Sequence, residues 1–253
     1  MLNDREPPPF TVENPDGASP IVLACDHASN LVPRALKGLG LVERELHRHI
    51  AWDQGAAEVT RGLSERLDAT AVLAGYSRLV IDCNRSPEHE TSIAEVSDGT
   101  TVPGNVGISE EARMARKRAL FDPYHDALAG ALDRVRGRGR MPVLVAVHSF
   151  TPVLAGEPRP WQISVLWGYD PRVPVPLLAA LRRRGDLEVG DNQPYSGRNR
   201  HGHTIKVHGS QTGTPHALIE IRADQVADSN GAARYVDILA GALQTVLTQL
   251  PAG

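Results

Sequence analysis

The sequence predicts an α/β fold, in which helices pack on both faces of a mixed, mainly parallel sheet. Short runs that are apolar throughout, such as 20–25 and 141–147, are typical of strands buried on both faces. These runs alternate with longer segments in which apolar residues recur at helical spacing. With 253 residues, 41% of them hydrophobic, the chain can bury one substantial core. We therefore expect a single domain over 1–253.

The elements begin after an irregular, Pro-rich arm at 1–19. Apolar runs predict strands at 20–25, 69–76, 77–83, 141–148, 161–168 and 217–222. Helical spacing predicts helices at 41–67, from Ser109 onward, at 174–184 and at 235–250. Ser109 precedes two glutamates, a helix-start pattern, because its hydroxyl can accept a backbone N–H bond. The polar stretches 84–109 and 186–210 are predicted loops, and the first is long enough to suggest that it lines a site.

The charge balance excludes several classes of protein. Lys and Arg total 27 against 30 Asp and Glu, so the net charge of −3 disfavours a nucleic-acid partner. No apolar run is long enough to span a membrane, and the acidic, Pro-rich start does not resemble an export signal. Two cysteines fit a reducing compartment. These features predict a soluble cytoplasmic protein without a membrane partner.

Polar residues follow or end four of the predicted strands: His27, Asn84 with Arg85, His148, and Glu220. In open α/β sheets, ligands bind at the carboxyl ends of the strands. Each residue alone is weak evidence, but four such strand ends together predict a functional site.

His27 and His148 are candidate metal ligands, because neutral imidazoles suit zinc and a catalytic zinc site uses three protein ligands. Asp53 is the candidate for the third. His49 and Asp53 are four residues apart on the predicted first helix, so they would share a face. A surface ion pair between these two residues explains the spacing equally well.

Glu220 lies between two isoleucines, where burial of a carboxylate is costly. One interpretation is a general base with a raised pKa that activates water. The other is a glutamate on an edge strand, facing solvent.

Asn84 and Arg85 suggest recognition of a carboxylate, since a guanidinium and a neighbouring amide can bind both of its oxygens. A structural pair between Arg85 and Asp82 is the alternative. Arg78 and Arg198 are candidates for a second carboxylate of a small acidic substrate.

The chain resembles the N-formylglutamate amidohydrolase family. The resemblance rests on several stretches distributed over about 20–225: DHASN, HIAWDQGA, SRLVIDCNRSP, SDGTTVPGN, DPYH, VHSF, NQPYSG and HALIEIR. It implies a fold similar to zinc-dependent carboxypeptidases and aspartoacylases, and hydrolysis of an amide on an acidic amino acid. It also implies metal ligands at His27 and His148, a general base at Glu220, and a carboxylate site at Asn84 and Arg85.

One position departs from the carboxypeptidase-type relatives, which place a glutamate three residues after the first metal histidine. Asn30 stands there in this chain, and an amide oxygen is a poorer zinc ligand than a carboxylate. Either Asp53 replaces the glutamate as a ligand, or the chain binds metal weakly.

The sequence therefore predicts a hydrolase that uses a divalent metal, with zinc expected, to cleave an N-acyl acidic amino acid such as N-formyl-L-glutamate. His208 is a candidate to stabilise the oxyanion. Two alternatives stay open. One is an amidase with Cys25 as nucleophile beside His27 or His148. The other is a non-catalytic binder of acidic metabolites without a working metal site.

Overall fold

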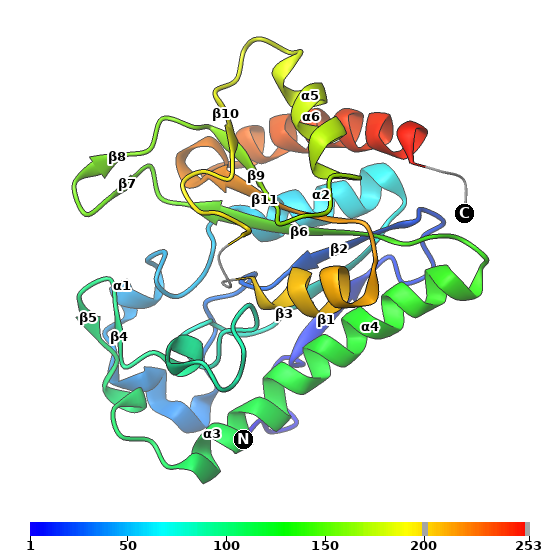
Figure 1. Cartoon of the computed structure of the whole chain (residues 1–253). Coiled ribbons are helices and arrows are strands. Elements are labelled where there is room, and N and C mark those ends of the chain that lie inside the picture. Colours follow the sequence, from blue (N-terminus) through cyan, green and yellow to red (C-terminus); the bar gives the residue numbers. More distant parts are fainter. Residues whose placement is uncertain (199–201, 251–253) are drawn as a thin grey trace.

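A seven-stranded sheet forms the centre of the molecule in the computed structural model, which describes residues 1–198 and 202–250 (Figure 1). The order of its strands is β1-β3-β2-β6-β11-β9-β10. Their bounds are β1 Phe10–Glu13, β2 Ile21–Cys25, β3 Thr70–Ala74, β6 Val143–Phe150, β9 Ile163–Leu166, β10 Val189–Asp191 and β11 His216–Arg222. Two small hairpins stand apart from it: β4 Val96–Ser97 with β5 Thr100–Thr101, and β7 Val153–Leu154 with β8 Glu157–Pro158.

The four central strands β3, β2, β6 and β11 run parallel to one another. β1 is antiparallel to β3, and β9 is antiparallel to β11. The predicted class, a mixed and mainly parallel sheet, is confirmed. The carboxyl ends of β2, β6 and β11 consequently meet at one edge of the sheet.

Helices cover both faces of the sheet, with α2, α5 and α6 on one face and α4 on the other (Figure 1). The α-helices are α1 Glu43–Leu46, α2 Ala56–Leu67, α3 Glu110–Arg116, α4 Asp122–Gly137, α5 Pro174–Arg182 and α6 Ser229–Gln249. Shorter helical turns are η1 Arg34–Gly40, η2 Glu90–Ile93, η3 Pro103–Asn105, η4 Lys117–Phe121, η5 Ile205–Gly209, η6 Ser210–Thr212 and η7 Ala223–Gln225. In the described part of the chain, no helix combines the length and the apolar character needed to cross a membrane.

The continuously apolar strands are buried as their composition predicts. Residues of β2, β6 and β11 that alternate along each strand pack against α2, α5 and α6 on one side, and against α4 on the other. The Ser109 side chain accepts a bond of 3.2 Å from the backbone N–H of Ala112, so the predicted N-cap of α3 is confirmed.

Two predicted elements are wrong at the amino-terminal half. The arm 1–19 is not wholly irregular, because its β1 pairs with β3 as an edge strand. The predicted helix at 41–67 is broken into α1 and α2, and α2 begins only at Ala56. His49 and Asp53 therefore do not lie on one helix.

The run 77–83 is not a strand either, although its composition favours one. Side chains satisfy its carbonyls: Asn105 Nδ2 donates to Leu79 O at 2.9 Å, and Arg116 Nη1 donates to Val80 O at 3.0 Å. Since the backbone groups already have partners, the segment forms a turn that reaches the edge of the sheet.

Candidate active site

A cavity of about 330 Å³ opens at the carboxyl edge of the sheet. Seven of the nine site residues predicted from the sequence line it: His27, Asp53, Arg78, Asn84, Arg85, His148 and Glu220. His148 and Glu220 lie on β6 and β11, His27 lies in the turn after β2, and the other four come from two loops. The topology of the sheet thus brings together residues that are distant in sequence.

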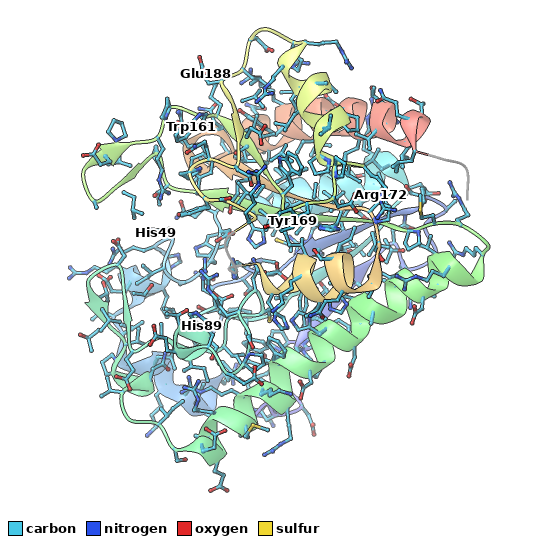
Figure 2. All side chains as sticks on the ribbon, in the orientation of Figure 1. His49, His89, Trp161, Tyr169, Arg172 and Glu188 are labelled. Atoms are coloured by element: carbon cyan, nitrogen blue, oxygen red, sulfur yellow. The ribbon has the colours of Figure 1, made fainter. Side chains whose placement is uncertain are left out.

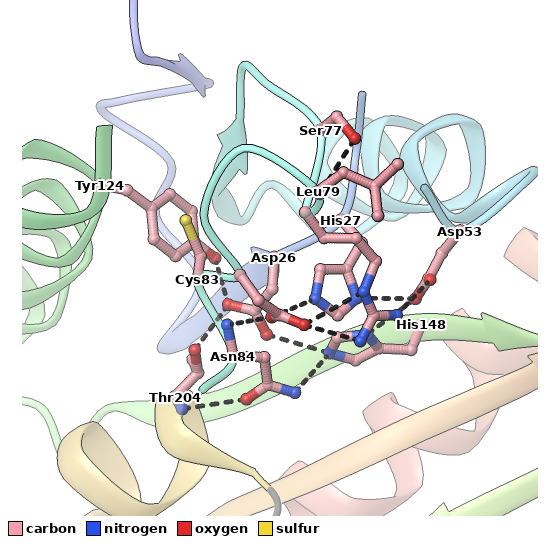
Figure 3. A network of polar contacts seen from close by, with 12 residues as sticks. Asp26, His27, Asp53, Ser77, Leu79, Cys83, Asn84, Tyr124, His148 and Thr204 are labelled. Atoms are coloured by element: carbon pink, nitrogen blue, oxygen red, sulfur yellow. Dashed lines mark hydrogen bonds and ion pairs between the residues drawn. The ribbon is translucent and has the colours of Figure 1, made fainter. Parts of the chain in front are cut away.

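His27, Asp53 and His148 form a buried cluster within this cavity (Figure 3). One potential ligand atom from each lies within 4.8 Å of the others. The Nδ1 atoms of His27 and His148 lie 3.3 and 2.8 Å from Asp53 Oδ2. Asp53 precedes α2, and its backbone N–H donates to His27 O at 3.0 Å, which fixes the loop against the end of β2.

Two further carboxylates hold the far nitrogens of these imidazoles. His27 Nε2 lies 2.7 Å from Asp82 Oδ1, and His148 Nε2 lies 3.0 Å from Asp26 Oδ2. This arrangement is typical of metal-binding histidines, in which a carboxylate accepts from one nitrogen and turns the other toward the ion. Two imidazoles and a carboxylate are also a donor set that suits zinc. The residues therefore fit a divalent metal centre.

Arg78 supports this cluster. Its Nη2 donates to Asp82 Oδ2 at 2.7 Å, and its Nη1 lies 3.5 Å from Asp53 Oδ1. Burial acts to raise the pKa of Asp82, but the positive charges of Arg78 and His27 outweigh it and hold the pKa well below its usual value. Asp82 consequently stays ionised.

Asp26 is anchored on the side of the sheet that faces α4. Tyr124 and Thr204 donate their hydroxyls to Asp26 Oδ1 at 2.8 and 2.5 Å. Burial opposes ionisation of Asp26, yet its bond to His148 lowers its pKa to about 2. The same pairing raises the pKa of His148 well above the usual value, against the effect of burial.

Glu220 lies on β11, an interior strand between β6 and β9, so the interpretation as a solvent-facing edge residue is wrong. It is paired in register with His148 on one side and Ser164 on the other. Only 8% of it is exposed, and its Oε2 atom has no hydrogen-bond partner among the described residues. Burial raises its pKa from 4.5 to about 7. Glu220 can therefore accept and release a proton near neutral pH.

Asn84 is held beside this cluster. Its Nδ2 lies 3.5 Å from His148 Nε2, and its Oδ1 accepts from the backbone N–H of Thr204 at 3.1 Å. Arg85 follows it on the cavity wall, and the backbone N–H of Arg85 donates to Asp82 O at 3.1 Å.

The other predicted residues lie elsewhere. His208 Nε2 lies 2.9 Å from His125 Nδ1, behind the lining of the cavity, so the structure does not support it as the oxyanion group. Arg198 lines a neighbouring hollow that shares Gly197, Gly202 and Ile205 with the cavity. Its guanidinium lies 5.7 Å from the centre of the Trp167 ring. His49 does line the cavity, but its Nε2 pairs with Asp98 at 3.3 Å (labelled in Figure 2).

Cys25 has the properties of a core residue. It is fully buried and packs among apolar side chains of the α2, α5 and α6 face. Burial raises the pKa of its thiol, which opposes formation of the nucleophilic thiolate.

Sequence reasoning missed Asp26 and Asp82 as members of the site. Both were visible as single carboxylates at the ends of apolar runs, directly before His27 and before Cys83 and Asn84. Buried carboxylates require a partner, and this requirement was the available signal.

The model of the N-formylglutamate amidohydrolase family matches residues 19–227. The chain belongs to this family. It is a hydrolase of amide bonds, as its membership of the N-formylglutamate amidohydrolase family shows.

Solved structures agree with this family assignment. The gene product Atu2144 from Agrobacterium tumefaciens is 35% identical, covers 98% of both chains, and superposes with a TM-score of 0.94. The N-formylglutamate amidohydrolase from Ralstonia eutropha JMP134 is 20% identical over 95% of this chain and 98% of its own. Its TM-score of 0.62 shows a shared fold. No curated protein matches the chain.

Proposed function

We propose that the protein is a metal-dependent amidohydrolase that removes a small acyl group from an N-acyl amino acid. N-formyl-L-glutamate is the candidate that the family description names. The observation that carries the proposal is the arrangement of one cavity, in which Glu220 lines the same space as the cluster of His27, Asp53 and His148. One oxygen of Glu220, Oε2, has no hydrogen-bond partner among the described residues.

His27, Asp53 and His148 would hold the metal, with zinc as the favoured ion. A bound divalent ion supplies polarisation of the acyl carbonyl and lowers the pKa of water. The protein contributes the orientation of its ligands, since Asp82 and Asp26 keep the imidazoles turned toward Asp53.

Arg85 and Asn84 would bind the α-carboxylate of the substrate. A guanidinium and an amide together offer a carboxylate several N–H donors in a planar arrangement. Both residues line the cavity beside the cluster, so a substrate held there would present its amide to Glu220.

Glu220 is the proposed general base and acid. It takes a proton from water as the water oxygen bonds to the acyl carbon. When the C–N bond breaks, Glu220 returns that proton to the leaving nitrogen. The products are a free carboxylate, formate for a formyl group, and an amino acid. A pKa of about 7 suits both transfers.

The decisive experiment is a screen of N-formyl, N-acetyl and N-succinyl amino acids with metal-free protein, before and after addition of zinc or cobalt. We expect release of the free amino acid only with metal, and about one metal ion retained per chain. Turnover that survives chelation but is lost in Cys25→Ser would favour the thiol mechanism. Tight binding of N-acylglutamate without metal or turnover would favour a binding protein.

A further inference from the structure

One wall of the active-site cavity is apolar. It is formed by Leu166 of β9, Ile205 of η5 and Leu218 of β11, each 4–5% exposed. Leu218 and Glu220 are two residues apart on β11, so their side chains share a face of the sheet. Leu166 is the register partner of Leu218 on the neighbouring strand. The apolar wall therefore adjoins the proposed general base.

The apolar wall also adjoins the proposed anchor for the α-carboxylate. Asn84 accepts two backbone bonds from the segment that leads into η5. Its Oδ1 accepts from Thr204 N–H at 3.1 Å, and its carbonyl accepts from His203 N–H at 3.1 Å. Ile205 is the next residue. A substrate whose carboxylate is bound at Asn84 would therefore lie close to Ile205, within reach of the apolar wall.

The cations that the described residues place in the cavity do not lie on this wall. Among the described residues that line the cavity, the guanidinium groups belong to Arg78 and Arg85. Arg78 already pairs with Asp82 and Asp53, and Arg85 is assigned to the α-carboxylate. A glutamate side chain turned to Leu166, Ile205 and Leu218 would lose water against three apolar side chains, which is costly for an ionised group.

We propose that the preferred substrate is an N-acyl amino acid with an apolar side chain, of the size of leucine, methionine or phenylalanine. This inference rests on the proposed function and names its substrate class. Glutamate is then a poorer substrate, and Leu166, Ile205 and Leu218 determine the specificity. One methylene in an apolar pocket changes kcat/KM by about 10- to 200-fold, so the preference is at least about tenfold.

A comparison of N-formyl derivatives tests the proposal directly. We expect kcat/KM for N-formyl-leucine to exceed that for N-formyl-glutamate by about tenfold or more, with zinc present in both assays. An equal or higher value for the glutamate compound overturns the inference and leaves the proposed amidohydrolase function intact. Failure to hydrolyse every N-formyl amino acid overturns the proposed function, and the inference falls with it.

A matched pair of variants locates the specificity. Ile205→Phe fills the cavity, whereas Val207→Phe adds the same ring on the same turn, at a residue outside the described lining. We expect Ile205→Phe to lower the ratio of kcat/KM for N-formyl-leucine to kcat/KM for N-formyl-alanine by about tenfold. The Val207→Phe ratio stays at the wild-type value. Should Ile205→Phe misfold by circular dichroism, Ile205→Ala is measured instead, and it is expected to raise the phenylalanine-to-leucine ratio. Unchanged ratios in a folded Ile205 variant overturn the role of the wall.

Discussion

Two pairs of buried histidines differ in what surrounds them. His27 and His148 contact the carboxylates of Asp26, Asp53 and Asp82, whose charges raise the pKa of both imidazoles despite burial.

His125 and His208 instead contact each other, with their rings stacked 5.2 Å apart. His125 Nε2 lies 2.9 Å from Cys83 O, an acceptor only, so this nitrogen carries the proton and Nδ1 accepts from His208. Burial dominates here and lowers the pKa of His125 to about 4. The comparison teaches that neighbouring carboxylates, rather than histidine itself, distinguish the two imidazoles of the proposed metal site from structural ones.

The largest effect should come from removing one imidazole of each pair. His148→Ala is expected to lower kcat/KM by roughly 10⁴-fold and to abolish metal retention, because the bound ion contributes several kcal/mol. His208→Ala is the matched control. It should keep its metal and lose stability of about 1–3 kcal/mol through its broken hydrogen bond. Metal analysis and urea unfolding of both variants measure the contrast, and equal metal loss in the two would contradict it.

Glu220→Gln should separate catalysis from stability. Loss of the general base is expected to reduce kcat by roughly 10³-fold. The folded chain binds more protons than the unfolded chain between pH 4.5 and about 7, so the stability contribution of Glu220 falls as the pH rises through that range. The glutamine does not titrate. Metal-free Glu220→Gln should therefore be more stable than the wild type above pH 7. A less stable variant would argue that burial does not raise the pKa of Glu220.

The sequence was sufficient to predict which strand ends carry His27, His148 and Glu220, because apolar runs interrupted by polar residues are local patterns. It was not sufficient to predict how Asp53 enters the site. Asp53 comes from a loop before α2 rather than from a helix face.

The position of His208 could not be predicted, since it depends on packing of η5 against α4, distant in sequence. The turn at 77–83 was missed because bonds from Asn105 and Arg116 outweigh its β propensity. Non-local hydrogen bonds thus account for these errors.

The carboxylates that orient the imidazoles should have intermediate effects. Asp82→Asn is expected to weaken metal affinity by about 10- to 100-fold, because the proposed ligand His27 loses its charged acceptor. Asp98→Asn removes a carboxylate from the more exposed His49 and provides a control with the same chemistry. Competition with a chromophoric chelator measures both affinities. Equal affinities in the two variants would mean that Asp82 does not orient a metal ligand.

The smallest effect concerns the second pair of histidines and depends on pH. His125→Phe leaves the Cys83 carbonyl without its donor, which costs about 1–3 kcal/mol near neutral pH. The lowered pKa of His125 means that the folded chain binds fewer protons than the unfolded chain between about 4 and 6.5. The wild type therefore loses stability as the pH falls through that range, and phenylalanine does not. Urea unfolding at about pH 7.5 and about pH 5 measures the free energy of unfolding of both proteins. The gap between the two free energies should narrow on acidification. A gap that widens would mean that His125 is protonated in the folded state, and the contrast between the two pairs would then be lost.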